Sequence, residues 1–568
     1  MKYFGLLKKN KIANIVVVNV LIVTVLLLLF RPAFKCDDYY MASIVYGVYS
    51  NVYDPHILYM NAAIGKLICF LLTIFPQVAW YTIIQLIACE VAIFTIMYIL
   101  WEKFDGFLPY LFIFAIIIQY ECTINITFTK TAGLLYASGL LVLLKENEKT
   151  IVKETLYGSF LFLIAEMFRP GLFLAELGFY FAGSFIVIIR RLMKKDYSFL
   201  KYYFIKILLI TAILIGAAKG LDCLDNYIYS IENEWKTYHA DNSKKATITD
   251  FSGNRYEEKK EAYEKIDCTE NDIIMLQKNN LYYKNSWEDL WINNILDIYS
   301  QKENTDNTIG QILNVESFRD FLVQFFNNYM HYYFISIIIL LYFIVAADMR
   351  NIDVLIVLLS ALVLENYYLY VNGRVFQKHI DFDLIISLTV LLFLLSHFVE
   401  KKDDNKYKLL LICFIVCTFI TIESDDLIDG RYQRYGDFSC DIDLGKEYME
   451  YISNDKAHLY ITTSEESVYS MWCYSPYEVM PKGELDNVFF MGEYLWPSIR
   501  SLLYNYDVEN PLVEIVDSET ILFFISDTIE IEEVSMMETY CQEHVNANAK
   551  FEKVDEYKSL NIYKCTTK

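Results

Sequence analysis

Long apolar runs separated by polar stretches dominate this chain from end to end. A helix needs about 20 apolar residues to cross ~30 Å of hydrocarbon, and the runs in this chain are close to that length. Eleven runs meet this description, and the pattern therefore predicts a polytopic α-helical membrane protein with about eleven transmembrane helices. They are residues 12–30, 78–101, 107–124, 131–144, 157–168, 171–189, 204–218, 329–347, 354–371, 380–398 and 409–422.

The first run resembles a signal peptide because Lys8, Lys9 and Lys11 precede it. It lacks a small-residue cleavage site, and further spans follow, so we expect a retained first helix with its basic flank in the cytoplasm.

Residues 61–75 decide the topology, because this apolar stretch is short, carries Lys66 and ends at Pro76. If it spanned the membrane, the basic loop that begins at Lys145 would lie outside. If it lies on the outer surface, that loop and the later basic loops all lie inside, as the positive-inside rule favours. We therefore predict a surface helix, a cytoplasmic N-terminus and an extracytoplasmic C-terminus.

Composition and charge support this division. Hydrophobic residues make up 55% of 568 residues and the mean hydropathy is +0.28, which indicates a bilayer environment. Residues 219–330 carry a net charge of −8 and residues 423–568 carry −19, whereas the whole chain carries −22. Two such acidic segments argue against binding to nucleic acid.

Four regions follow from these patterns. We expect a membrane module over residues 1–218 with its first outer loop at 31–77, an extracytoplasmic and mainly helical loop domain at 219–330, further transmembrane helices at 331–422, and an extracytoplasmic α/β domain at 423–568. Helices are predicted at 257–265, 287–299 and 497–504, and strands at 459–463, 513–527 and 560–564.

An acidic pair, Asp37 and Asp38, stands just beyond the first span in the sequence KCDDYYMASIVYG. Carboxylates at this position act as a general base, bind a metal or simply face water. A short amphipathic helix over 39–49, a turn, His56 and the surface helix follow.

This order of elements resembles the GT-C class of membrane glycosyltransferases, which includes the protein O-mannosyltransferases and the lipid A aminoarabinose transferases. The resemblance is one of layout and covers about residues 1–398. It implies that an acidic residue early in the first outer loop acts at the transfer centre, and that the donor is a sugar linked to polyprenyl phosphate.

Two further positions bear on the resemblance. The class often has an acidic residue in its second outer loop. In the matching stretch YECTINITFTKT the only carboxylate is Glu121, which lies earlier than expected. Lys130 and Thr131 stand where the acidic residue is expected. A second catalytic or metal-binding carboxylate is therefore in doubt. The class places a basic residue between the fifth and sixth helices, and this chain has Arg169 in EMFRPG.

The transfer of a sugar from a phosphate to a hydroxyl needs a base for the proton and cations for the phosphate. Asp37 or Asp38 supplies the base in this interpretation. No cofactor is required, although a divalent metal is compatible, and a single displacement inverts the anomeric carbon. The candidate cations at the outer rim are Arg169, Arg374, Lys378, His379, Lys66 and His56.

Each candidate also has a structural interpretation. Arg169 is equally expected to cap its hairpin, Lys66 to extend its amine from a surface helix towards water, and His56 to be an ordinary loop residue. Glu166 lies in an apolar span, where a carboxylate is costly and is expected to face a polar cavity or the interface.

We therefore predict a bacterial plasma-membrane glycosyltransferase that moves a sugar from polyprenyl phosphate to a glycan, lipid or protein acceptor of the cell envelope. The alternatives are a transporter or flippase of a lipid-linked or small solute, and a catalytically inactive scaffold of the same fold. The absence of an internal repeat and the charges at the outer rim favour the enzyme over a transporter.

Overall fold

The computed structural model describes most of the membrane region and of the C-terminal domain. The described residues are 10–30, 32–34, 37–101, 108–145, 151–236, 238–239, 256–278, 280, 294–295, 298, 315–329, 351–371, 378–396, 442–463, 474–491, 497–527 and 529–568.

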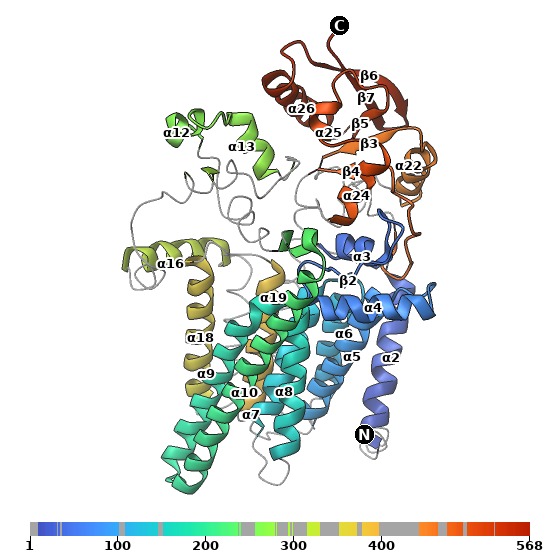
Figure 1. Ribbon diagram of the computed structural model, residues 1–568. Coiled ribbons are helices and arrows are strands. Elements are labelled where there is room, and N and C mark those ends of the chain that lie inside the picture. The colour runs from blue at the N-terminus through green and yellow to red at the C-terminus, as the bar shows by residue number, and fades with distance from the viewer. Residues whose placement is uncertain are drawn as a thin grey trace.

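The membrane region is a bundle of helices that run along a common direction (Figure 1). Five of the described helical segments are long and apolar enough to cross a membrane, which makes the chain a multi-pass membrane protein. The helices of the bundle are α2 (Lys11–Leu29), α5 (Trp80–Leu100), α6 (Leu108–Thr123), α7 (Phe128–Leu144), α8 (Ile151–Phe168), α9 (Phe173–Met193), preceded by the 3-10 turn η3 (Pro170–Leu172), α10 (Tyr197–Ser230), α18 (Ile352–Val371) and α19 (Lys378–Leu395).

These helices coincide with nine of the predicted spans, while the predicted spans at 329–347 and 409–422 lie outside the described residues. The largest difference concerns α10, which was expected at 204–218 and extends over Tyr197–Ser230. The prediction ended where polar residues begin, but polar residues continue a helix readily once it has left the hydrocarbon.

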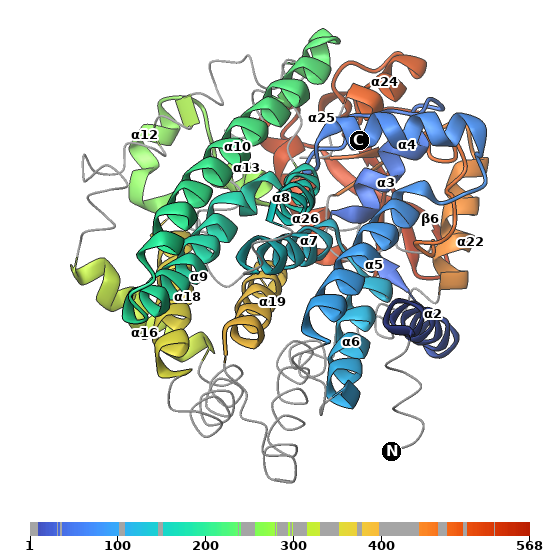
Figure 2. The ribbon, with the colours of Figure 1, turned by 90° about the horizontal axis from the view of Figure 1, so that it is seen from below.

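Helix α7 lies at the centre of the bundle, with α5, α8 and α19 around it (Figure 2). Every residue of α7 is buried except Lys130, which is partly exposed. In α2, by contrast, most apolar side chains are exposed, as expected for a helix that faces lipid.

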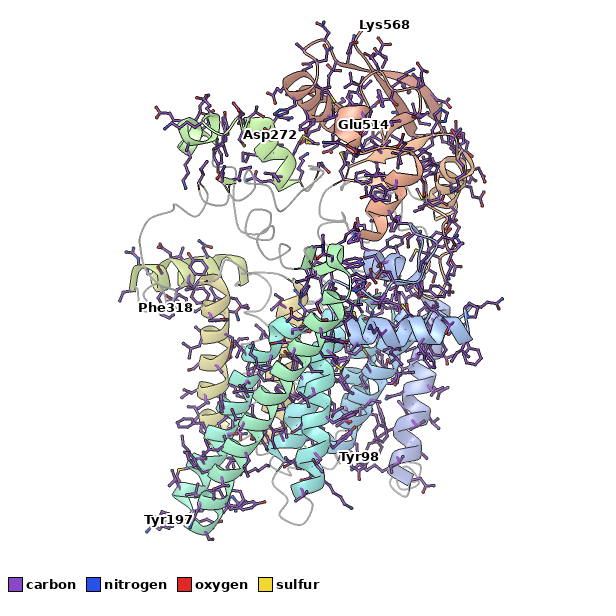
Figure 3. All side chains as sticks on the ribbon, in the orientation of Figure 1. Tyr98, Tyr197, Asp272, Phe318, Glu514 and Lys568 are labelled. Atoms are coloured by element: carbon purple, nitrogen blue, oxygen red, sulfur yellow. The ribbon has the colours of Figure 1, made fainter. Side chains whose placement is uncertain are left out.

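Helix α4 (Ala62–Ile74) crosses the bundle near the end that carries the C-terminal domain (Figure 1). Asn61 caps it, because its side chain accepts a hydrogen bond from the Ala63 N–H at 3.0 Å. The Ala62 N–H donates to Asp225 of α10 at 2.7 Å. We call the end of the bundle that carries the C-terminal domain the domain-bearing end. Tyr98 and Tyr197 lie towards the opposite end (Figure 3).

Two short parallel strands connect the loops at the domain-bearing end. Strand β1 (Ala33–Phe34) pairs with β2 (Asn125–Ile126), which directly precedes α7. Helix α3 (Asp38–Tyr46) follows β1, and all nine of its residues are buried. The segment that begins with the acidic pair is therefore fixed against the start of the central helix.

The C-terminal domain contains a five-stranded sheet in the order β4-β3-β5-β7-β6. The three strands β4, β3 and β5 are parallel, and β7 and β6 are antiparallel to their neighbours. Its elements are α22 (Ile442–Asn454), β3 (Leu459–Thr462), β4 (Val488–Phe490), α24 (Pro497–Asn505), α25 (Pro511–Glu514), β5 (Ile521–Ser526), α26 (Glu530–His544), β6 (Lys550–Tyr557) and β7 (Leu560–Thr566).

One strand prediction in this domain was wrong in part. The run 513–527 was expected to be extended throughout, but its first residues belong to the short helix α25. Pro511 occupies the first turn of α25 and the Asn510 side chain accepts from the Leu512 N–H, so local capping chemistry prevails over β propensity.

The loop domain contributes α12 (Lys260–Glu264), the 3-10 turn η4 (Glu257–Lys259), α13 (Glu270–Gln277) and α16 (Val315–Tyr329), while most of the predicted helix 287–299 lies outside the described residues. Helix α13 contacts α26 of the C-terminal domain through polar side chains. His544 hydrogen-bonds Asp272 at 2.8 Å, and Lys278 pairs with Glu533 at 2.8 Å.

The C-terminal domain contacts the first outer loop directly. The Gly483 N–H donates to the Gly47 carbonyl at 3.0 Å, and the Leu485 N–H donates to the Val48 carbonyl at 3.1 Å. The Ser43 hydroxyl contacts the Met480 sulfur at 3.6 Å. Helix α3 is thus enclosed between the bundle and the C-terminal domain, which explains its complete burial.

Candidate functional site

Asp38 is the centre of a hydrogen-bond network at the domain-bearing end. Its side chain is fully buried, and its Oδ1 accepts from the Tyr81 hydroxyl at 2.8 Å and from the Gln85 amide at 3.1 Å. The Phe128 N–H at the start of α7 lies 3.1 Å from Oδ1 and 3.3 Å from Oδ2. A carboxylate at this position also interacts favourably with the N-terminal end of the α7 dipole.

Burial and hydrogen bonding act in opposite directions on this carboxyl. Burial raises the pKa of Asp38 to about 7, although Tyr81, Gln85, the Thr127 side chain and the Phe128 N–H all favour the ionised form. Asp38 therefore changes its charge close to neutral pH, which is unusual for an aspartate and typical of functional sites.

The network extends into the bundle. The Thr131 hydroxyl donates to the Gln85 side-chain carbonyl at 3.2 Å, and the Cys89 thiol donates to the Thr131 hydroxyl at 3.4 Å. Gln85 and Cys89 lie on α5 and Thr131 on α7, so the two helices are joined by polar contacts beneath Asp38.

Asp37 precedes α3 and is less buried than Asp38. Its backbone carbonyl accepts from the Met41 N–H at 3.1 Å and begins the helix. The two adjacent aspartates therefore occupy different environments: Asp38 is enclosed by donors, and Asp37 lies at the edge of the same site.

Arg169 lies beside this network. Its guanidinium carbon is 5.2 Å from the centre of the Phe128 ring and 5.9 Å from that of the Tyr59 ring. The residue occupies the N-cap position of the turn η3, but its side chain makes no capping hydrogen bond there. The side chain packs over Phe128, the residue whose N–H binds Asp38.

His56 and Lys66, two further candidate cations, lie in contrasting surroundings. His56 is 2% exposed, donates or accepts at Nδ1 with Asp54 at 2.6 Å, and stacks on Trp235 with ring centres 4.6 Å apart. Lys66 is exposed on α4. The contact with Asp54 and the stacking on Trp235 hold the His56 ring in place, although its Nε2 is buried and has no hydrogen-bond partner among the described residues. We leave His56 out of the proposed site.

Glu121 forms an ion pair with Lys130 of α7. Its side chain is 1% exposed, and that of Lys130 is 12% exposed. The unusual lysine in the second loop is thus the partner of the early glutamate, and the two charges compensate each other inside the protein.

Glu166 accepts a hydrogen bond from the Tyr136 hydroxyl at 2.6 Å, deep among the helices. Glu176 of α9 is also fully buried and accepts from the Ser387 hydroxyl of α19 at 2.8 Å. Both carboxylates lie near those ends of their helices that face the domain-bearing end, so the bundle beneath the site is polar.

Three predicted cations remain, namely Arg374, Lys378 and His379. Arg374 lies outside the described residues, and for Lys378 and His379 the structure describes the start of α19 but not the side chains. Within the described part of the chain, no group of three or more histidine, cysteine, aspartate or glutamate side chains is arranged to hold a metal ion.

Sequence reasoning missed Tyr81, Gln85, Phe128 and Glu176. Gln85 and Glu176 carry a signal that was available, since both are polar residues within apolar spans, the same feature that singled out Glu166. Tyr81 and the Phe128 N–H carry none, because aromatic residues are common at the ends of spans and a backbone donor has no sequence signature.

Comparisons with known proteins give one structural similarity. It is to the crystal structure of ArnT from Cupriavidus metallidurans bound to undecaprenyl phosphate, with 9% sequence identity, 98% of each chain covered and a TM-score of 0.39. ArnT is a lipid A aminoarabinose transferase, one of the classes named above. No family model and no curated protein matches the chain. The function proposed below rests on the side chains around Asp38 and not on this similarity.

Proposed function

We propose that this chain is a membrane glycosyltransferase that moves a sugar from polyprenyl phosphate to a hydroxyl of a cell-envelope acceptor at the domain-bearing end, which lies outside the cell. We assign the general base to Asp37 and a positioning role to Asp38. Arg169 is the cation that faces the phosphate.

The arrangement around Phe128 carries this proposal. Its N–H donates to Asp38, and its ring packs against the Arg169 guanidinium. Phe128 therefore contacts both the acidic pair and a cation. Transfer from a sugar phosphate requires such a pair of opposite charges, one for the acceptor proton and one for the leaving phosphate.

The reaction is a single displacement. The acceptor oxygen forms a bond to the anomeric carbon as the bond between that carbon and the phosphate oxygen breaks. The electron pair of that bond leaves with the phosphate, whose charge Arg169 stabilises, and the acceptor proton passes to Asp37. Attack opposite the leaving group inverts the anomeric configuration.

The difference in exposure favours Asp37 over Asp38 as the base in this proposal. The oxygens of Asp38 already accept from four groups and the side chain has no exposed surface, which argues against access by an acceptor hydroxyl. Asp38 instead fixes the start of α3 against α5 and α7, and thereby holds Asp37 in place.

The decisive experiment measures transfer of a radiolabelled sugar from a polyprenyl-phosphate donor pool in membranes that hold equal amounts of each variant. Asp37→Asn should lower transfer by about 10²–10⁴-fold with an unchanged melting temperature. Asp38→Asn should lower both transfer and melting temperature, because the new amide group faces donors. Arg169→Ala should lower transfer about 10²-fold.

Glu552→Gln, an exposed substitution on β6, is the matched control and should behave as wild type. The assignment of the two roles is reversed if Asp38→Asn alone abolishes transfer at an unchanged melting temperature. Full transfer by Asp37→Asn and Asp38→Asn together would rule out chemistry at this loop and favour a transporter or an inactive scaffold.

A further inference from the structure

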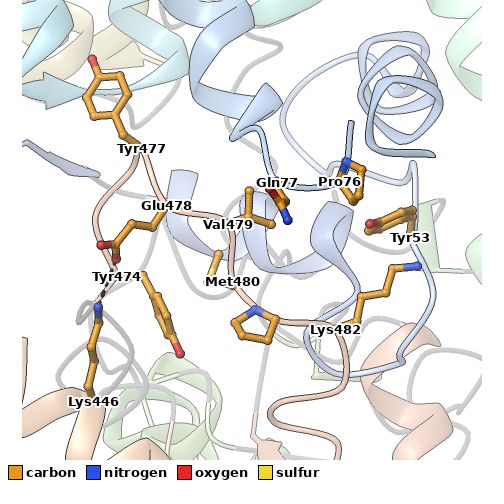
Figure 4. A pocket seen from close by; sticks show the side chains of 11 residues that line it. Tyr53, Pro76, Gln77, Lys446, Tyr474, Tyr477, Glu478, Val479, Met480 and Lys482 are labelled. Carbon is orange, nitrogen blue, oxygen red and sulfur yellow. Dashed lines mark hydrogen bonds and ion pairs between the residues drawn. The ribbon is translucent and has the colours of Figure 1, made fainter. Parts of the chain in front are cut away.

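A groove lies where the C-terminal domain meets the first outer loop (Figure 4). Its volume is about 600 Å³, within the range of about 300–1,000 Å³ typical of small-molecule sites. One wall comes from the loop, with Tyr53, Pro76 and Gln77. The other comes from the C-terminal domain, with Lys446, Tyr474 and residues 477–482.

The lining combines aromatic rings with hydrogen-bonding groups. Tyr53, Tyr474 and Tyr477 supply three rings, and Gln77 and Glu478 supply an amide and a carboxylate. Ring faces pack against the C–H faces of a sugar, and the polar groups bond its hydroxyls, whereas a purely apolar ligand would leave these groups without partners.

One pair of charges in the groove is compensated, because Lys446 pairs with Glu478 at 3.2 Å. Lys482 keeps its charge and lies over one face of the Tyr53 ring, with its amine 3.3 Å from the ring centre. The lining lysines and glutamate therefore carry a single net positive charge, which fits a neutral or weakly acidic polyhydroxyl ligand.

Three contacts connect the groove with the surroundings of Asp38. The Tyr477 hydroxyl donates to the Thr123 carbonyl at 3.2 Å, next to β2. The Thr82 hydroxyl donates to the Pro476 carbonyl, and Thr82 adjoins Tyr81, which binds Asp38. The Met480 sulfur contacts Ser43 on α3. A ligand in the groove thus lies against the same loop that carries the acidic pair.

We propose that this groove is a saccharide-binding subsite that holds the non-reacting part of a glycan acceptor. The proposal rests on the proposed function in naming the ligand as the acceptor. Remote sugars would then bind equally in the ground state and in the transition state, and so lower the acceptor KM without changing kcat.

Binding and transfer are measured separately, so that the two proposals can fail independently. Full-length protein in lipid nanodiscs is titrated with oligosaccharides released by mild acid from the envelope of the native cells, and binding is followed by saturation-transfer NMR. Tyr53→Ala and Tyr474→Ala should each weaken saccharide binding at least about fivefold. Tyr504→Ala, a 69% exposed tyrosine on α24, is the matched control.

Asp37→Asn should bind the saccharide as wild type does, since it alters the transfer site and not the groove. If Tyr474→Ala lowers the amount of folded protein, the single variants Tyr53→Ala and Lys482→Gln test the groove in its place. In the transfer assay the groove variants should raise the acceptor KM and leave kcat nearly unchanged.

Equal saccharide binding by wild type and all groove variants would overturn the proposal, as would no binding by wild type. Preferential binding of inorganic phosphate, or of nanodiscs that contain phosphatidylglycerol, with loss in Lys482→Gln, would overturn it in favour of an anion or lipid headgroup site. Saccharide binding without any transfer would support the groove and contradict the proposed enzyme.

Discussion

Asp38 and Glu121 are two buried carboxylates at the same end of the bundle, and they are stabilised in different ways. Glu121 is compensated by a cation, Lys130, on the central helix. Asp38 is surrounded by uncharged donors, namely a phenol, an amide and a backbone N–H. Both are almost fully removed from solvent.

The difference determines what each group can do. An ion pair fixes the charge of both partners, and the removal of either one leaves an uncompensated buried charge. Uncharged donors stabilise a carboxylate without neutralising it, so Asp38 can gain a proton near neutral pH. The first arrangement is suited to holding two helices together, and the second to a site whose charge changes.

The largest expected effect comes from removal of the cation. Lys130→Met should lower the free energy of unfolding by roughly 3–5 kcal/mol, because Glu121 would stay buried without its counterion. Thermal unfolding of the purified protein in detergent measures the change, and the double variant Lys130→Met/Glu121→Gln should recover most of it.

Lys219→Met provides the comparison for an exposed pair. Lys219 is 77% exposed and pairs with Asp222 at 2.9 Å, so its substitution should change the melting temperature very little. Equal small shifts for Lys130→Met and Lys219→Met would show that Glu121 is protonated in the folded protein and that the ion pair has no structural role.

A second, smaller effect concerns pH. Because the pKa of Asp38 is raised in the folded state, the folded protein binds this proton more tightly than the unfolded chain does. Stability from this group is therefore greatest at low pH and is lost as pH rises through about 7. We expect a decrease of about 2 kcal/mol between about pH 5.5 and about pH 7.5.

The Asp38→Asn variant isolates this contribution, since asparagine does not titrate. Its melting temperature should change less with pH than that of the wild type across the same interval. A wild type and a variant with parallel pH profiles would contradict the raised pKa of Asp38.

The smallest effect is expected at a third buried carboxylate, Asp272, whose partner His544 titrates. The hydrogen bond to Asp272 raises the pKa of His544, so its contribution is present at low pH and is lost as pH rises through the raised pKa. The loss should be under about 1 kcal/mol, because His544 is partly exposed.

Hydrogen-exchange protection factors of residues 260–278, which divide out the intrinsic pH dependence of amide exchange, measure this effect at about pH 5.5 and about pH 8. Protection in α13 should decrease at the higher pH as its contact with α26 weakens. Asp272→Asn should show the same protection at both pH values. Lys278, which pairs with Glu533 nearby, should keep part of the contact in every case. Higher protection at the higher pH would contradict the assignment.

The sequence predicts the bundle better than the domain above it. Long apolar runs have few alternatives to transmembrane helices, so most described helices coincide with predicted spans. In the C-terminal domain β4, β6, α22 and α26 were not predicted, because their apolar positions depend on which neighbours cover them. Pro511 shows the limit of propensity, since one capped turn redirects a β-rich run.

For the candidate site, the acidic pair and Arg169 were identified from sequence, but their surroundings were not. Asp38 obtains its donors from α5 and from the start of α7, about 43 to 90 residues away along the chain. Such contacts arise only when the strands β1 and β2 pair and bring the first outer loop to α7. A single sequence therefore indicates which residues carry charge and not which of them is accessible.

Helix α10 is longer than one membrane crossing requires. Its 34 residues measure about 51 Å at 1.5 Å per residue, whereas the hydrocarbon core measures only ~30 Å. The helix continues without a break to the domain-bearing end, where Asp225 accepts a hydrogen bond from the first N–H of α4. One continuous helix thus couples the position of α4, and of the loop that leads to it, to the rest of the bundle.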